Sequence, residues 1–151
     1  MTQRVEFDVD VVEARLRDLS RRLDRVAARK PRSLKQLADD EDLQDILSRN
    51  LELAIQACVD VAAHLCGAYG VVPATAGDAF EALAKRGVVS RPLATRLKRA
   101  VGFRNVLAHE YVEIDWKIVM RVIRRDTRDL AAFGKAVLAL VERARRRPGS
   151  E

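Results

Sequence analysis

Glycine and proline are scarce in this sequence, with 7 Gly and 4 Pro among 151 residues. Turn-rich β architectures depend on such residues, because they supply the backbone conformations of tight turns. No segment shows a run of alternating apolar and polar residues rich in β-branched side chains, and no internal repeat is present. These absences argue against a β protein and favour helices.

Cysteine and histidine are rarer still. Cys58 and Cys66 are eight residues apart in a segment predicted to be helical, which separates them by about 12 Å along the helix axis, too far to form a disulfide within it. The two cysteines do not have the spacing of a zinc site, and His64 and His109 are isolated. We therefore expect no metal site and no cofactor.

The sequence also lacks a signal-peptide pattern and an evident membrane span. The uncharged stretch LAIQACV ends at Asp60, far short of the roughly 20 apolar residues that a membrane-spanning helix needs. We therefore expect a cytoplasmic protein with reduced thiols and no membrane association.

Positive charge is in excess, with 28 Lys and Arg against 22 Asp and Glu and a formal net charge of +6. Such a balance makes polyanions plausible partners, because lysine and arginine side chains that face phosphates release condensed counterions. The alternative is a solvated, arginine-rich helical surface without a nucleic-acid partner. Charge alone does not decide between the two.

Apolar residues recur at alternating steps of three and four along most of the chain, as in amphipathic helices with one buried face. This spacing predicts a helix from Val12 to just before Pro31, a long helix over 43–68 behind an acidic cluster at 39–42, and a last helix over 115–144. Between them we expect a shorter helix introduced by Thr75 and closed by Gly87, and a helix capped by Ser90 that ends near Ala108. Residues 34–37 are expected to form a short connector.

These elements predict an all-α fold, an up-and-down bundle of four main helices plus a shorter helix. The length is that of one domain. We place a single domain over 1–145 and a flexible basic tail over 146–151, where the sequence RARRRPGSE ends the chain.

The segment VGFRNVLAHEY, residues 101–111, carries an unusual set of polar residues. Arg104 follows Leu97 by seven positions and Val101 by three, so it shares the stripe that otherwise buries aliphatic side chains. A charge placed there must be paired or must line a wet cleft. His109 lies about 140° around a straight helix from Arg104, so the two converge only if the helix ends near Ala108 or if they face each other across a two-fold axis.

The stretch RNVLAHEY resembles the R-x4-H-x-Y motif of the HepT toxins, a branch of the HEPN family of all-α ribonucleases. The resemblance continues through LQDILSRNLELAIQACVDVAAHL, FEALAKRGVVS and RLKRAVGFRNVLAHEYVEID, in this order, and so covers residues 43–115. It implies a HEPN-like dimeric bundle and a metal-independent endoribonuclease, with one Arg and one His from each subunit in a shared cleft.

Carried over residue by residue, the catalytic pair is Arg104 and His109. His109 would act as general base or acid, and Arg104 would stabilise charge on the phosphoryl oxygens. Asn105 matches the polar residue common after the arginine and would bind the phosphate or fix the helix end. Tyr111 matches the tyrosine to which an MntA-like nucleotidyltransferase antitoxin attaches AMP, so the resemblance implies a toxin–antitoxin system of the HepT/MntA type (type VII), with RNA, possibly tRNA, as substrate.

Further residues are auxiliary candidates. Asp60 and His64 share a face of the long helix at i and i+4, and a structural ion pair between them is the favoured interpretation over a role in the cleft. Arg99, with Arg96 and Lys98, is placed to track RNA phosphates, although exposed helix charges often serve solubility alone. The other functions considered are a non-catalytic nucleotide- or RNA-binding dimer that partners a nucleotidyltransferase, and a helical dimer without a site.

Overall fold

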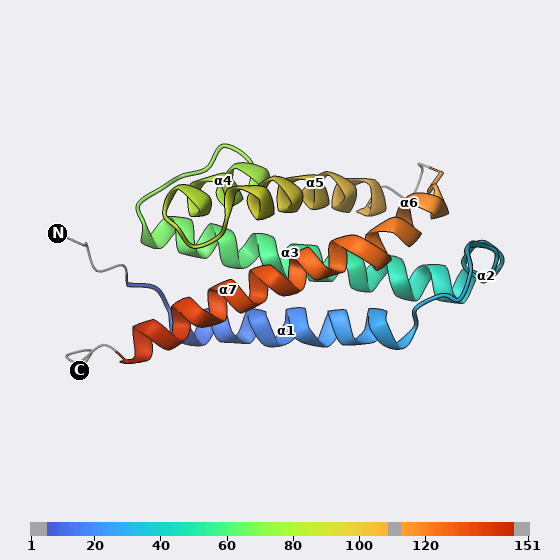
Figure 1. Ribbon diagram of the computed structural model, residues 1–151, viewed down its shortest axis with the longest axis horizontal. Helices are drawn as coiled ribbons and strands as arrows, with labels where there is room; N and C mark the ends of the chain where they lie inside the picture. Colours follow the sequence, from blue (N-terminus) through green and yellow to red (C-terminus); the bar gives the residue numbers. More distant parts are fainter. Residues whose placement is uncertain (1–5, 109–112, 147–151) are drawn as a thin grey trace.

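The computed structural model describes residues 6–108 and 113–146, and within these ranges the chain is helical with short connections. Figure 1 shows the long helices running along one axis, with α3 between α1 on one side and α4 and α5 on the other, and with α7 crossing in front. In chain order the elements are α1 (Val9–Ala28), α2 (Leu34–Asp39), α3 (Glu41–Ala68), α4 (Ala76–Lys85), α5 (Arg91–Ala108), α6 (Trp116–Arg121), the π-helix η1 (Val122–Asp126) and α7 (Thr127–Arg146).

The helices begin where the sequence supplies capping side chains. Thr75 Oγ1 accepts a hydrogen bond from the backbone N–H of Asp78, Ser90 Oγ accepts one from Leu93, and Asp115 Oδ1 accepts one from Lys117. These bonds satisfy N–H groups that have no partner inside the helix. Gly87, with a φ of 76°, follows α4 in the left-handed conformation. The predicted starts and the predicted glycine stop are therefore confirmed.

The core forms around α3, whose buried residues span almost its whole length. One apolar cluster joins α3 to α1, α4, α5 and α7, and a second lies toward α2 and α6. In the first, the rings of Phe80 and Phe133 meet edge to face, with their centroids 5.4 Å apart. By length and composition α3 is apolar enough to cross a membrane, but the apolar side chains responsible are those that the surrounding helices bury, as in the core helix of a soluble protein.

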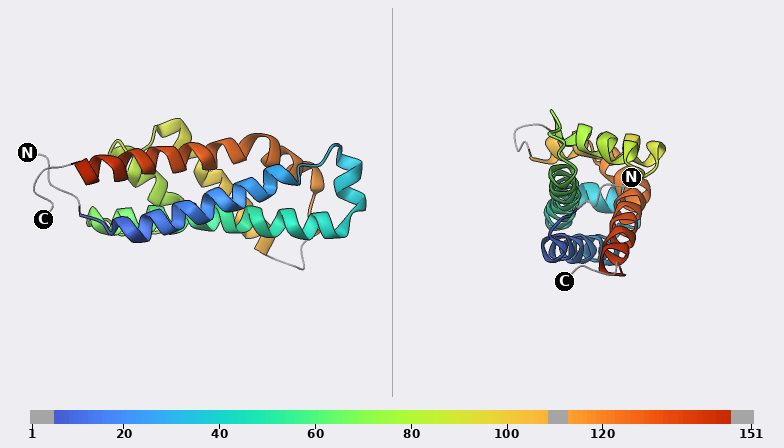
Figure 2. Two further views of the ribbon diagram at one scale, coloured as in Figure 1. Left: turned by 90° about the horizontal axis from the view of Figure 1, so that it is seen from below. Right: turned by 90° about the vertical axis from the view of Figure 1, so that its left-hand side faces the viewer.

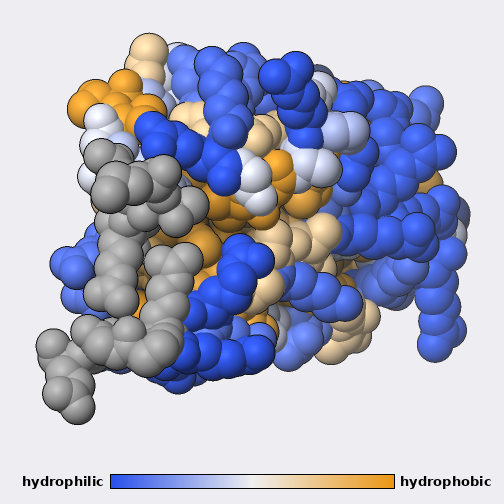
Figure 3. All heavy atoms as spheres, turned by 60° about the vertical axis from the view of Figure 1, so that its left-hand side comes forward, coloured by the Kyte–Doolittle hydropathy of each residue, from blue (hydrophilic) through white to orange (hydrophobic). Residues whose placement is uncertain are grey.

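Hydrophilic residues surround a connected apolar area on one face of the molecule, as Figure 3 shows with the left-hand side of Figure 1 brought forward. The right-hand view of Figure 2, along the bundle, shows the long helices arranged around a common centre. The predicted all-α bundle is confirmed by this arrangement.

Two predicted elements are wrong in detail. Residues 34–37 are not a connector but belong to α2, which Ser33 caps and which buries Leu37 completely. The last helix is not a regular α-helix throughout, because the π-helix η1 lies between α6 and α7. Val119, Met120, Val122 and Ile123 are buried around this junction. Their spacing is that of an ordinary amphipathic helix, so the burial pattern does not explain the π turn.

Candidate functional site

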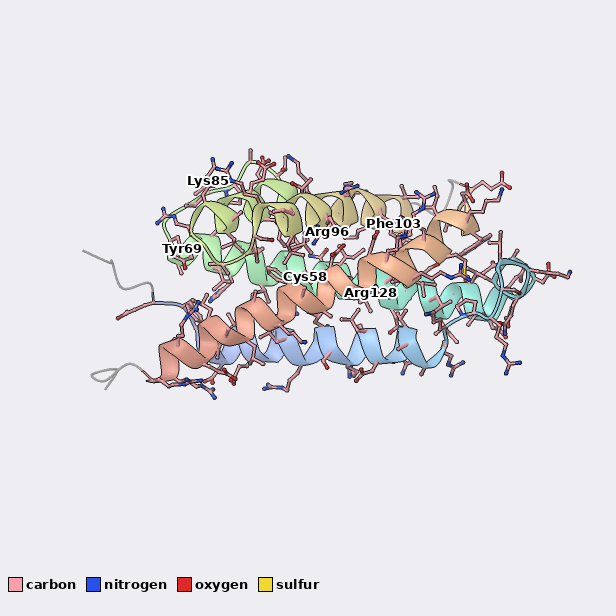
Figure 4. The ribbon with its side chains drawn as sticks, viewed as in Figure 1. Cys58, Tyr69, Lys85, Arg96, Phe103 and Arg128 are labelled. Carbon is pink, nitrogen blue, oxygen red and sulfur yellow. The ribbon has the colours of Figure 1, made fainter. Side chains whose placement is uncertain are left out.

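Arg104 lies on α5, four residues before Ala108, and is half-buried. Its Nη1 donates a hydrogen bond of 2.8 Å to Oε1 of Gln56 on α3, and its Nη2 donates one of 3.2 Å to Oδ1 of Asn105. In Figure 4, the label of Phe103 lies toward this end of α5. Both partners are uncharged amides, so they hold the guanidinium in place without a carboxylate to neutralise its positive charge.

Gln56 continues the contact along α3. Its Nε2 donates a hydrogen bond of 2.8 Å to Oδ1 of Asp60, one turn further on. The other carboxylate oxygen, Oδ2, lies 3.9 Å from Nη1 of Arg15 on α1. A polar chain therefore runs from α5 across α3 to α1, and sequence reasoning had named Arg104 and Asp60 in it but had missed Gln56.

A signal for Gln56 was present in the sequence. It precedes Asp60 by four residues and His64 by eight, so all three lie on one face of α3. Over 53–68 this face is polar, whereas the other residues of that part of α3 are mostly apolar. Glutamine is uncharged and common on helix surfaces, which is why its position did not draw attention.

His64 and Asp60 do not form the ion pair that their spacing predicts. His64 Nε2 accepts a hydrogen bond of 3.1 Å from the backbone N–H of Asp8, the residue that caps α1. Asp60 instead contacts Gln56 and Arg15. His64 therefore ties the start of α1 to α3, and both residues line a groove between α1 and α3.

His109 and Tyr111, the predicted catalytic histidine and the predicted modification site, lie outside the described residues. The described part of α5 reaches Ala108, and the described chain resumes at Glu113 before the Asp115 cap. Whether α5 ends near Ala108, one of the two conditions for Arg104 and His109 to converge, stays a prediction. Their convergence stays a prediction.

The basic residues of α5 are largely engaged with acidic neighbours. Arg96 Nε lies 2.9 Å from Oδ1 of Asp129, and Lys98 Nζ lies 2.8 Å from Oε1 of Glu81. Arg99 is close enough to Asp126 to oppose the rise in its pKa. Arg96 and Lys98 are thus less available to RNA than their sequence positions suggested, and the role of Arg99 stays a prediction.

The described residues contain no group of three or more His, Cys, Asp or Glu side chains arranged to hold a metal ion. Cys58 and Cys66 are free thiols in the core. Burial raises the pKa of both thiols, and Arg86 partly opposes this for Cys66. A buried thiol with a raised pKa is a poor nucleophile, so neither cysteine competes with Arg104 as the centre of a site.

The sequence of the chain is similar to those of known proteins. The sequence model of the family described as "Ribonuclease HepT-like" matches residues 13–137. The mRNA nuclease HepT of Shewanella oneidensis is 33% identical over 99 residues, which are 65% of this chain and 74% of that protein. The tRNA nuclease HepT of Aphanizomenon flos-aquae is 31% identical over 106 residues, 70% of this chain and 72% of that protein.

Solved structures share the fold. A tri-AMPylated Shewanella oneidensis HEPN toxin in complex with an MNT antitoxin superimposes with a TM-score of 0.80 at 28% identity, covering 86% of this chain and 98% of that one. A toxin–antitoxin structure with AMP-PNP has the same TM-score and coverage at 27% identity. The cytosolic protein YutE of Bacillus subtilis, of unknown function, has a TM-score of 0.77 at 20% identity over 91% of this chain and 93% of that one, a likeness of fold alone.

Proposed function

Because the chain belongs to the family of HepT-like ribonucleases, we propose that it is a toxin endoribonuclease of the HepT/MntA type. The proposal depends on how the Arg104 guanidinium is held. A half-buried guanidinium is held by two neutral amides at the end of α5, beside the segment that completes the R-x4-H-x-Y motif. A fixed positive charge of this kind is suited to a phosphodiester.

In the proposed reaction the ribose 2′-oxygen attacks the adjacent phosphorus while the bond from phosphorus to the 5′-oxygen breaks. His109 accepts the proton of the 2′-hydroxyl or donates one to the leaving 5′-oxygen. Arg104 stabilises the negative charge that gathers on the phosphoryl oxygens, and Asn105 contacts the phosphate or maintains the helix end. The products are a 2′,3′-cyclic phosphate and a 5′-hydroxyl, and no step of this scheme requires a metal ion.

Neutralisation is proposed to act through Tyr111. An MntA-like nucleotidyltransferase would transfer AMP from ATP to the phenolic oxygen and release pyrophosphate. The added phosphodiester carries negative charge and bulk to a position seven residues from Arg104, where it would compete with RNA for the guanidinium. The solved relative that is AMPylated and bound to an MNT antitoxin supports this part of the proposal.

The substrate is proposed to be RNA, with tRNA and mRNA as the two classes to compare, because one relative is named for each. We further propose a homodimer of single domains over 1–145 with a basic tail over 146–151, acting in the cytoplasm. The competing function is a non-catalytic dimer that binds RNA or nucleotide and serves as substrate for the partner enzyme. An intact arginine and histidine pair favours the enzyme, since binding alone needs no titratable imidazole.

The test compares purified wild-type protein with Arg104→Ala and His109→Ala on total tRNA and on an mRNA transcript, with and without EDTA. The expected result is cleavage by the wild type in EDTA, 2′,3′-cyclic phosphate ends, and loss of cleavage in both variants with unchanged helical circular dichroism. Binding of RNA by the wild type without cleavage would favour the non-catalytic dimer instead.

A further inference from the structure

We propose that Gln56 is a positioning residue for the reaction, which holds the Arg104 guanidinium in place while leaving its positive charge free for the substrate phosphate. The inference rests on the proposed ribonuclease function. It concerns a residue on α3, 48 positions away from Arg104 in sequence, joined to it by a hydrogen bond of 2.8 Å.

The hydrogen-bond partners of Arg104 carry no charge. An arginine at a half-buried position usually faces a carboxylate, which fixes the guanidinium but neutralises it. Across the described residues, no carboxylate lies within ion-pair distance of Arg104, whereas other arginines such as Arg96 and Arg145 have one. Gln56 and Asn105 supply the hydrogen bonds in its place. The guanidinium keeps its full charge and has further N–H groups to offer a phosphate.

The contact with Asp60 fixes the orientation of the Gln56 amide. A glutamine side chain can present either its oxygen or its NH2 group to a neighbour. The Asp60 carboxylate only accepts hydrogen bonds when ionised, so the NH2 group of Gln56 must face Asp60, and Nε2 does so at 2.8 Å. The amide oxygen is then left facing Arg104. Asp60 thus determines which atom of Gln56 the arginine meets.

The contacts of Asp60 with Gln56 and with Arg15 differ in strength. The bond from Gln56 to Asp60 is charge-assisted on one side and short, so it is the firm part of the chain. The contact between Asp60 and Arg15 is 3.9 Å long, and the two side chains are 37% and 54% exposed. Exposed pairs of this length contribute little. The orientation of Arg104 therefore depends on Gln56 and Asp60 and only weakly on Arg15.

The decisive variant is Gln56→Glu in the full-length protein. The change keeps the shape of the side chain and an oxygen opposite Arg104, but it replaces the NH2 group that donates to Asp60 with a second carboxylate oxygen. It places a negative charge beside the guanidinium, which the new ion pair should still hold in place while neutralising it. Retained Arg104 N–H signals together with a reduced kcat therefore separate the loss of available charge from a loss of structure. We expect kcat for RNA cleavage to fall by about tenfold or more, while KM changes by less than about threefold.

Gln36→Glu is the matched control. Gln36 lies in α2, and its Oε1 accepts a hydrogen bond of 2.7 Å from the backbone N–H of Arg32. The same substitution there adds the same charge and also keeps an accepting oxygen, but at a residue that is not among the hydrogen-bond partners of Arg104. Cleavage by Gln36→Glu should equal that of the wild type. Equal loss in both variants would assign the effect to net charge and would overturn the role of Gln56.

A second measurement does not depend on activity. In 15N-labelled protein the side-chain N–H signals of Arg104 are assigned by their loss in Arg104→Lys. We expect resolved, slowly exchanging guanidinium signals in the wild type and broadened, averaged signals in Gln56→Leu, because the leucine accepts no hydrogen bond. Unchanged Arg104 signals in Gln56→Leu would overturn the proposal, as would an unchanged kcat in Gln56→Glu.

The two proposals fail in different ways. If the wild type cleaves no RNA, the proposed function falls, and the Arg104 signals still decide whether Gln56 holds the guanidinium. If the wild type cleaves RNA and Gln56→Glu cleaves it equally well, the proposed function stands and the role of Gln56 falls. If circular dichroism shows that Gln56→Glu does not fold, Gln56→Leu takes its place. Its kcat should also fall, and its Arg104 signals should broaden.

Discussion

Arg104 has a position typical of a core residue and the contacts of a functional one. Its neighbours on the α5 stripe, Leu97 and Val101, are buried, yet its guanidinium reaches Gln56 on α3 and Asn105 beside it. Two separate N–H groups make these bonds, which uses the planar geometry of arginine. A lysine at this position would keep the charge but lose that geometry.

Arg104→Lys is therefore expected to retain RNA binding and to lose most of the cleavage. RNA binding depends on charge, whereas stabilisation of the transition state depends on where the N–H donors lie. Loss of such a donor lowers kcat by about 100-fold or more. Single-turnover cleavage and filter binding of the same RNA measure the two effects. Wild-type cleavage by the lysine variant would show that charge alone is sufficient.

Tyr111→Phe tests the proposed acceptor of AMP. A phenol with a pKa of about 10 is a poor proton acceptor at neutral pH compared with an imidazole, so toxicity should be largely kept. Neutralisation should be lost, because no phenolic oxygen remains to receive AMP. Co-expression with the partner transferase, followed by growth and intact mass, gives both readouts. Continued gain of AMP would move the acceptor elsewhere, first to Tyr69.

The sequence allowed Arg104 and Asn105 to be named because the motif spacing is local. It did not reveal Gln56, because that contact joins residues 48 positions apart and depends on how α3 and α5 pack. It also suggested an ion pair between Asp60 and His64, since helical spacing brings their side chains to one face. Spacing along one helix does not show that other helices offer better partners, here Arg15 for Asp60 and the Asp8 N–H for His64.

Among the elements, the end of α4 depends on one backbone conformation. Gly87 has a φ of 76°, which an L-amino acid with a side chain adopts only at a cost, so Gly87→Ala should destabilise the fold by about 1 kcal/mol. Gly67→Ala in α3 is the control, because a Cβ there meets no atom within 4 Å. It should be neutral or stabilising by up to about 1 kcal/mol. Thermal unfolding of the two variants should shift in opposite directions or only for Gly87.

The π-helix η1 holds a carboxyl group in an unfavourable place. Burial raises the pKa of Asp126, repulsion by Asp129 adds to this, and Arg99, Arg121 and Arg125 oppose it. The folded chain thus binds this proton more tightly than the unfolded chain. The free energy of unfolding therefore decreases as pH rises from the ordinary pKa of aspartate through the raised value, and the penalty is complete above it.

Asp126→Asn should accordingly raise Tm at pH of about 7, by a free energy below about 1 kcal/mol because solvent screens a half-buried group. The gain should vanish at pH of about 3, where the aspartate is protonated in both states. Thermal unfolding at the two pH values, followed by circular dichroism, measures the difference. A gain that is equal at both would contradict an electrostatic cause.

Helix starts and stops were predictable because caps are local. The side-chain oxygens of Thr75, Ser90 and Asp115 and the glycine at position 87 act within a few residues of themselves. The helix α2 and the π turn of η1 were not predictable in the same way. The first is too short for a clear apolar period. The second lies within a stretch whose apolar spacing is that of a regular α-helix, so the pattern contains no signal for a π turn.

At the scale of the whole molecule, the proposed composite cleft would be shared by two copies of the chain. Sedimentation equilibrium should give twice the chain mass of 16.9 kDa. The expectation follows from the angular separation of Arg104 and His109 on a straight helix and from the two-fold symmetry usual in homodimers. A monomer at micromolar concentration would remove the reason for a shared cleft, and the site would then have to be complete in one chain.

The packing of α7 against α1 joins the two ends of the described chain, as Figures 1 and 2 show. Phe133, Val137 and Val141 of α7 share one apolar cluster with Val12 and Leu19 of α1. During translation, α1 leaves the ribosome long before α7 has been synthesised, so the core lacks one of its walls until α7 is made. Domains fold as units, and this bundle therefore cannot complete its core while only its first five helices have been made.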